Sequence, residues 1–172
     1  MPLPTDPLLD FADAMATAIA TAYAALEIGA TASVPSVTWP WALTCQRAYV
    51  PAKKAEELTG LYVYVIPPRR PRERNGRVWK FEPELSLCVQ KRLSPAATLT
   101  GDARAAALKL ETDQLMAFAT SLENWIGSAD RVAYKTPDEI THDVAYLPKD
   151  LDERELFVRV IRAKFFDGVT AR

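Results

Sequence analysis

The chain has 172 residues, of which 49% are hydrophobic and 25% charged, and its 21 Lys and Arg residues nearly balance its 22 Asp and Glu residues. This composition is typical of one globular domain and excludes a disulfide scaffold, a collagen-like repeat and a long disordered chain. The near-zero net charge also argues against a nucleic-acid binder held by overall charge.

The first predicted element is an amphipathic helix over residues 7–27. Asp6 and Pro7 are a favourable N-cap and first helical residue, and Gly29 is expected to end the helix. Apolar side chains recur at helical spacing, at Leu8, Phe11, Met15, Ile19, Tyr23 and Leu26. Alanines on the other faces permit close approach by another helix or subunit. The first ten residues lack a basic region and no apolar run is long enough for a bilayer, so we expect neither a signal peptide nor a membrane partner.

Three strands are predicted in the middle of the chain. Residues 42–50 form a short strand, and 52–58 allow one or two helical turns. Residues 61–66 are apolar on both faces, which is typical of a central strand. Residues 79–90 alternate between apolar and polar side chains and predict one long, half-buried strand. Pro83 cannot donate to a β-ladder, so that part is expected at an edge or a bulge.

A second long helix is predicted over residues 102–126, with Leu108, Leu115 and Leu122 seven residues apart on one stripe. A short strand over 131–135, an irregular acidic segment over 137–155 and a last strand over 156–166 follow. The order α-β-β-β-α-β-β predicts a single α+β domain over 1–172. Its sheet is expected to be mixed, mainly antiparallel and of about four to five strands, with the two long helices packed on one face.

The sequence contains no nucleotide-binding, metalloprotease or serine-hydrolase motif. His142 is the single histidine, and it is interpreted as a solvated loop residue. The neighbouring carboxylates Glu82 and Glu84 are interpreted as the solvated face of an edge strand. Cys45 and Cys88 are expected to be free, buried thiols of a reducing compartment. The sequence therefore predicts no catalytic residues, no cofactor and no metal site, and the protein is not expected to be an enzyme.

Two segments carry opposite charge. Residues 67–77 hold five arginines against Glu73, and three prolines are expected to keep this arm or hairpin loop extended. Residues 137–155 hold seven carboxylates against Lys149 and Arg154. We expect the basic arm of one copy to meet the acidic surface of a neighbouring copy, because arginine pairs well with carboxylates. The predicted partner contacts are Arg69, Arg70, Arg72, Arg74 and Arg77 in the arm and Asp138, Glu139, Asp143, Asp152 and Glu153 in the acidic segment.

Two other interpretations of these segments stay open. Both segments could be solvated loops with no partner, or the five arginines could contact a DNA backbone. Residues 67–77 contain no aromatic side chain, which disfavours recognition of single strands by base stacking.

Several stretches resemble the tail terminator (tail-completion) proteins of long-tailed bacteriophages. They are LTCQRAYVPAKKAEELTGLYVYVIP, the alternating ELSLCVQKRL, the helical DQLMAFATSLENWI and the closing strand ELFVRVIRAKFF. The resemblance covers the scheme of most of the chain. The Pro- and Arg-rich segment 67–77 departs from the family pattern.

The resemblance implies a structural virion protein that forms a hexameric ring. Such a ring caps the head-proximal end of the tail tube, ends tube polymerisation and provides the surface for head docking. The implied partners are other copies of the chain, the tail tube protein, a head–tail connector or stopper protein, and genomic DNA passing through the lumen. The implied location is the tail or neck of a virion assembled in bacterial cytoplasm. The alternatives are another neck protein, such as a stopper or head-completion ring, and a basic-loop nucleic-acid-binding protein.

Overall fold

The computed structural model describes residues 7–49, 57–69, 72–75, 78–81, 84–95, 98–128, 136–142 and 155–165. Their elements, in chain order, are α1 (Pro7–Ala24), β1 (Leu43–Arg47), β2 (Leu61–Arg69), β3 (Arg72–Asn75), β4 (Val78–Phe81), β5 (Glu84–Arg92), α2 (Gly101–Gly127), β6 (Glu139–His142) and β7 (Leu156–Lys164).

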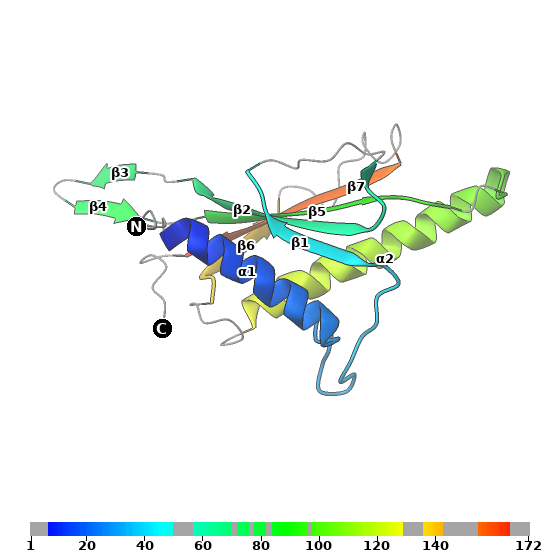
Figure 1. Cartoon of the computed structure of the whole chain (residues 1–172), viewed down its shortest axis with the longest axis horizontal. Helices are drawn as coiled ribbons and strands as arrows, with labels where there is room; N and C mark the ends of the chain where they lie inside the picture. The colour runs from blue at the N-terminus through cyan, green and yellow to red at the C-terminus, as the bar shows by residue number, and fades with distance from the viewer. Residues whose placement is uncertain are drawn as a thin grey trace, which may run out of the picture.

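Five of the strands form one sheet in the order β1-β2-β5-β7-β6, and β3 and β4 form a separate two-stranded sheet. The pair β1–β2 is parallel, whereas β2–β5, β5–β7 and β6–β7 are antiparallel. Both helices lie on the same side of the five-stranded sheet (Figure 1). The predicted α+β class, with a mixed and mainly antiparallel sheet, is confirmed.

The main core lies between this sheet and the two helices. Phe11 of α1 and Phe118 of α2 are fully buried in it, together with Val63, Leu87 and Ile161 from the sheet. α1 packs on β1 and β2, and α2 packs on β7. Most of the apolar positions that repeat every three or four residues along each helix are buried in this core, as helical periodicity requires, whereas Tyr23 and Leu108 are only partly buried.

The opposite face of the sheet differs between its two ends. Tyr62, Tyr64 and Cys88 are buried in a second apolar cluster with Leu156 and Val158. Toward the other end of β5 and β7 the same face carries charged residues. This charged end is where the chain leaves β2 for β3, so it forms the base of the two-stranded sheet.

Three predicted boundaries are wrong. Residues 79–90 do not form one strand, because β4 and β5 belong to different sheets and the break falls at residues 82–83, which include Pro83. Residues 67–77 are not simply a loop: β2 continues to Arg69, and β3 pairs with β4 despite its charged sequence. The segment 137–155 contains β6, a polar edge strand too short for periodicity to indicate.

The helices lie close to their predicted ranges. α1 ends at Ala24, before the predicted boundary, and Leu26 then adopts a left-handed backbone with φ 61°. The predicted strand 131–135 and most of the predicted helical turns at 52–58 lie outside the described residues. Neither helix of the described chain combines the length and the apolar character that a bilayer span requires.

Candidate assembly site

The two-stranded sheet of β3 and β4, called the arm here, extends beyond the ends of β2 and β5 (Figure 1). In its register Arg72 lies opposite Phe81 and Arg74 lies opposite Trp79. Cross-strand partners share one face of a β-ladder. The arm therefore pairs two arginines with two aromatic residues across its strands, and these are residue types that protein interfaces favour.

The aromatic residues of the arm were missed by the interpretation of residues 67–77 as a complete arm. The sequence did hold a signal for the longer hairpin, because Asn-Gly is a strong turn dipeptide and occurs at residues 75–76. Reading a hairpin about this dipeptide would have placed Trp79 and Phe81 opposite the arginines.

The predicted contact residues fall into three groups. Arg72 and Arg74 lie in β3, and Arg69 ends β2. Glu139 begins β6, and the N–H of Asp138 donates to the carbonyl oxygen of Lys164 at 2.9 Å. The remaining five, Arg70, Arg77, Asp143, Asp152 and Glu153, lie outside the described residues.

At the base of the arm, four neighbouring strands present a row of alternating charge. In the register Arg69 lies opposite Glu84, Glu84 opposite Lys164, and Lys164 opposite Glu139. Lys164 Nζ is 3.4 Å from Glu139 Oε2. Three strand spacings separate Arg69 from Glu139 by roughly 14 Å, too far for direct contact. Predicted basic and acidic partners thus lie on the same sheet of one subunit without direct contact, and Glu139 pairs with Lys164 instead.

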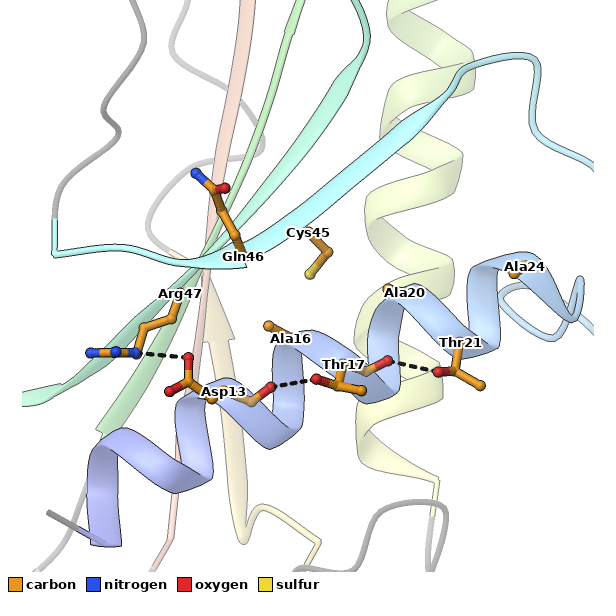
Figure 2. A pocket seen from close by; sticks show the side chains of 9 residues that line it. All are labelled: Asp13, Ala16, Thr17, Ala20, Thr21, Ala24, Cys45, Gln46 and Arg47. Carbon is orange, nitrogen blue, oxygen red and sulfur yellow. Dashed lines mark hydrogen bonds and ion pairs between the residues drawn. The ribbon is translucent and has the colours of Figure 1, made fainter. Parts of the chain in front are cut away.

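A groove of about 720 Å³ lies between the outer face of α1 and β1 (Figure 2). α1 contributes Asp13, Ala16, Thr17, Ala20, Thr21 and Ala24, and β1 contributes Cys45, Gln46 and Arg47. Cys45 points toward α1 and Gln46 points away from it, so the groove opens at the outer edge of β1 (Figure 2).

The walls of the groove are mainly apolar. The hydroxyls of Thr17 and Thr21 donate to the carbonyl oxygens of Asp13 and Thr17, each at 2.9 Å within the helix. Their hydroxyl donors are therefore used within α1 itself, and the alanines add only methyl groups. An ion pair marks one end of the groove, where Arg47 Nε lies 2.8 Å from Asp13 Oδ1.

The Cys45 thiol of the groove is not activated for nucleophilic chemistry. Burial raises the pKa of Cys45 to about 12, so the thiol is protonated at neutral pH and is a poor nucleophile. The described residues include no group of three or more His, Cys, Asp or Glu arranged to hold a metal ion. The groove is thus suited to binding a surface by shape and burial.

No family model, curated protein or solved structure matches the chain. What the chain does is therefore inferred from its own residues and surfaces.

Proposed function

We propose that this protein is a structural ring subunit of a long-tailed phage, the tail terminator. In this role a ring of identical copies caps the head-proximal end of the tail tube, stops addition of tube subunits and offers the surface to which the head docks. The proposal is supported by the sequence stretches that resemble the family, which occupy β1, β2, β5, the second half of α2 and β7.

The structural observation that carries the proposal is the presence of two unlike surfaces on one small subunit. The arm extends beyond the sheet with arginine and aromatic residues paired across its two strands, and the α1–β1 groove lies open on the body of the same chain. A ring requires a heterologous interface, in which one patch contacts a different patch on the next copy. A projecting element and a recessed element on each copy meet that requirement.

The decisive experiment measures tube length. The purified chain is added to the tail tube protein of the same phage or prophage while that protein polymerises, and the tubes are imaged by negative stain. We expect shorter tubes that carry a ring at one end. An unrelated globular protein of similar mass is the control. Tubes of unchanged length and without end rings would contradict the terminator function.

The same images distinguish the nearest alternative. A ring that forms by itself but neither binds the tube nor shortens it, and that binds filled heads instead, would support a stopper or head-completion protein. Mass photometry of the chain alone measures ring formation without any partner.

A DNA-contacting role is the second candidate, favoured by Arg72 and Arg74 on one strand of the arm. It requires duplex binding that weakens steeply as salt rises, because phosphate contacts release counterions. Replacing the five arginines of residues 67–77 by serine would then abolish binding. The absence of duplex binding at low salt would exclude this role.

A further inference from the structure

We propose that the arm of one copy occupies the α1–β1 groove of the next copy and adds a strand to the outer edge of β1. This inference rests on the proposed ring of identical copies and specifies which two surfaces form its interface. It assigns the recipient surface to α1 and β1, and not to the acidic segment 137–155.

The groove can receive a chain segment because its walls are made of small side chains. Ala20, Ala24 and the methyl groups of Thr17 and Thr21 leave the space of about 720 Å³ open (Figure 2). The monomer leaves Ala20 and Ala24 exposed even though α1 buries its opposite face completely. Large aromatic side chains gain most from covering such a surface, since they bury the largest apolar areas. The arm supplies two, at Trp79 and Phe81.

The edge of the sheet supplies a second, independent point of attachment. Among the described strands, β1 pairs with β2 alone, and its other edge lies beside the groove. Such an edge is a template for an added strand. A strand of the arm that lay there would form main-chain hydrogen bonds while its side chains entered the groove.

The arm needs a partner for its own stability. β3 and β4 have four residues each and pair only with each other among the described strands. A two-stranded hairpin by itself is marginally stable in water, and it gains independent stability from a third strand or a packed helix. The outer edge of β1 and the face of α1 would provide both.

The sign of the charge around α1 is opposite to that of the arm. Residues 1–49 contain four carboxylates against Arg47, whereas residues 69–81 contain six basic residues against Glu73. Asp10 on α1 is exposed, and the side chain of Asp13 is 54% exposed although it pairs with Arg47. Glu139 of the acidic segment likewise pairs with a cation of its own subunit, Lys164.

Chemical cross-linking between two singly substituted chains tests the contact directly. In a Cys45→Ala background, one chain carries Thr17→Cys in the groove and a second carries Asn75→Cys in the arm. A short bis-maleimide is added to each chain alone and to their mixture. Because the contact is heterologous, we expect covalent dimers from the mixture and none from either chain alone. A mixture of Asn75→Cys with Glu139→Cys, which reports on the acidic segment, should give none.

A substitution that fills the α1–β1 groove tests how much this groove contributes to the free energy of assembly. Ala20→Arg places a large cation in the groove and should raise the concentration needed for assembly by roughly a hundredfold or more, as loss of an interface centre does. Ala105→Arg makes the same change at an exposed position of α2, far along the chain from the groove, and should assemble like the parent. Equal thermal midpoints for the two variants would establish that both remain folded.

The outcomes separate this inference from the proposed function. Rings that form normally with Ala20→Arg, or that cross-link Asn75→Cys to Glu139→Cys and not to Thr17→Cys, would overturn the groove contact and leave the ring intact. A parent chain that stays monomeric at every concentration by mass photometry, without cross-links and without effect on tubes, would overturn both.

Discussion

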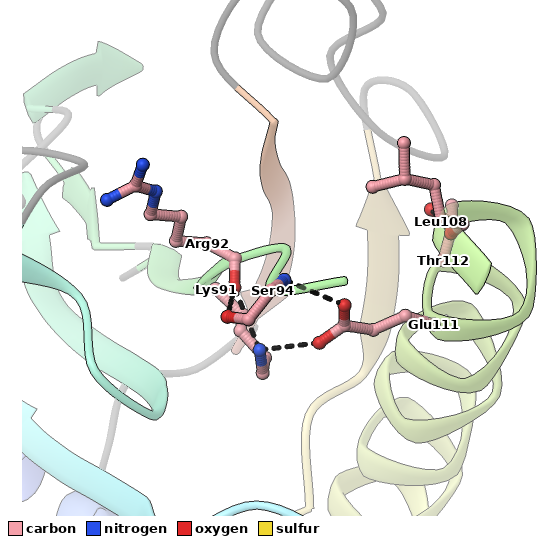
Figure 3. Close-up of polar contacts among 6 residues, drawn as sticks. All are labelled: Lys91, Arg92, Ser94, Leu108, Glu111 and Thr112. Atoms are coloured by element: carbon pink, nitrogen blue, oxygen red, sulfur yellow. Dashed lines mark hydrogen bonds and ion pairs between the residues drawn. The ribbon is translucent and has the colours of Figure 1, made fainter. Parts of the chain in front are cut away.

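Lys91 and Glu111 form an ion pair between the end of β5 and the middle of α2, with 2.6 Å between Lys91 Nζ and Glu111 Oε1. The same ammonium donates to the carbonyl oxygen of Arg92 at 2.8 Å, and Glu111 Oε2 accepts the N–H of Ser94 at 3.0 Å (Figure 3). The first buried residue of α2 is Leu115. The pair therefore fixes α2 to the sheet just where the helix begins to extend beyond it (Figure 1).

Removing the carboxylate from this pair should destabilise the fold. The side chain of Lys91 is only 6% exposed and that of Glu111 is 16% exposed. Glu111→Ala leaves a nearly buried ammonium without its counter-ion, so we expect a loss of roughly 2–3 kcal/mol in the free energy of unfolding. Urea denaturation measures it. The double variant Lys91→Met/Glu111→Leu removes both charges and should recover most of the loss; an equally unstable double variant would contradict this explanation.

A second ion pair joins α2 to β7 further along the helix. Arg159 Nη2 lies 2.5 Å from Glu123 Oε1, and the Arg159 side chain is only 4% exposed. Glu123→Ala should therefore cost about 3 kcal/mol, since it leaves a buried guanidinium unpaired. The double variant Arg159→Met/Glu123→Leu removes both charges and should cost clearly less. Thermal unfolding of the two variants checks the order, and the reverse order would show that packing of the arginine stem dominates.

Gly60 tests the parallel pairing of β1 and β2. A Cβ at this position would lie 2.7 Å from the carbonyl oxygen of Ala42, which accepts the N–H of Leu61 at 2.9 Å. Because the obstructing atom belongs to the backbone, Gly60→Ala must displace the start of the pair, and we expect a loss of about 1–3 kcal/mol. In Gly127→Ala the new methyl meets only the end of the Ile140 side chain, so this control should be close to neutral. Denaturant midpoints compare the two.

The local elements could be predicted from the sequence better than the contacts between them. The spacing of Phe11, Met15 and Ile19 predicted the buried face of α1, and the apolar character of residues 61–66 on both faces predicted a central strand. Local pattern carries that information because helix and strand periods are fixed. β3 forms through its pairing with β4, so its charged sequence has no burial pattern to detect.

In the candidate site, too, the local features could be predicted from the sequence and the contacts between elements could not. The arginines of the arm and the open alanine face of α1 could be recognised from the sequence alone. Their surroundings could not, because the row from Arg69 to Glu139 joins four strands that are distant in the chain. The ion pair of Lys91 with Glu111 is likewise set by the packing of α2 on the sheet, which no spacing of residues encodes.

Stability should fall in alkaline solution because of the buried thiol of Cys88. Burial raises the pKa of this thiol from 9.0 to about 12. Below pH 9 the thiol is protonated in both states and has no effect; between pH 9 and 12 only the unfolded chain loses the proton, so unfolding becomes more favourable by about 1.4 kcal/mol per pH unit. Urea denaturation at pH 7, 9.5 and 10.5 measures the slope. Cys88→Ala lowers stability at neutral pH by leaving a cavity, yet it should flatten the alkaline slope by about that amount, and an unchanged slope would exclude Cys88 as its source.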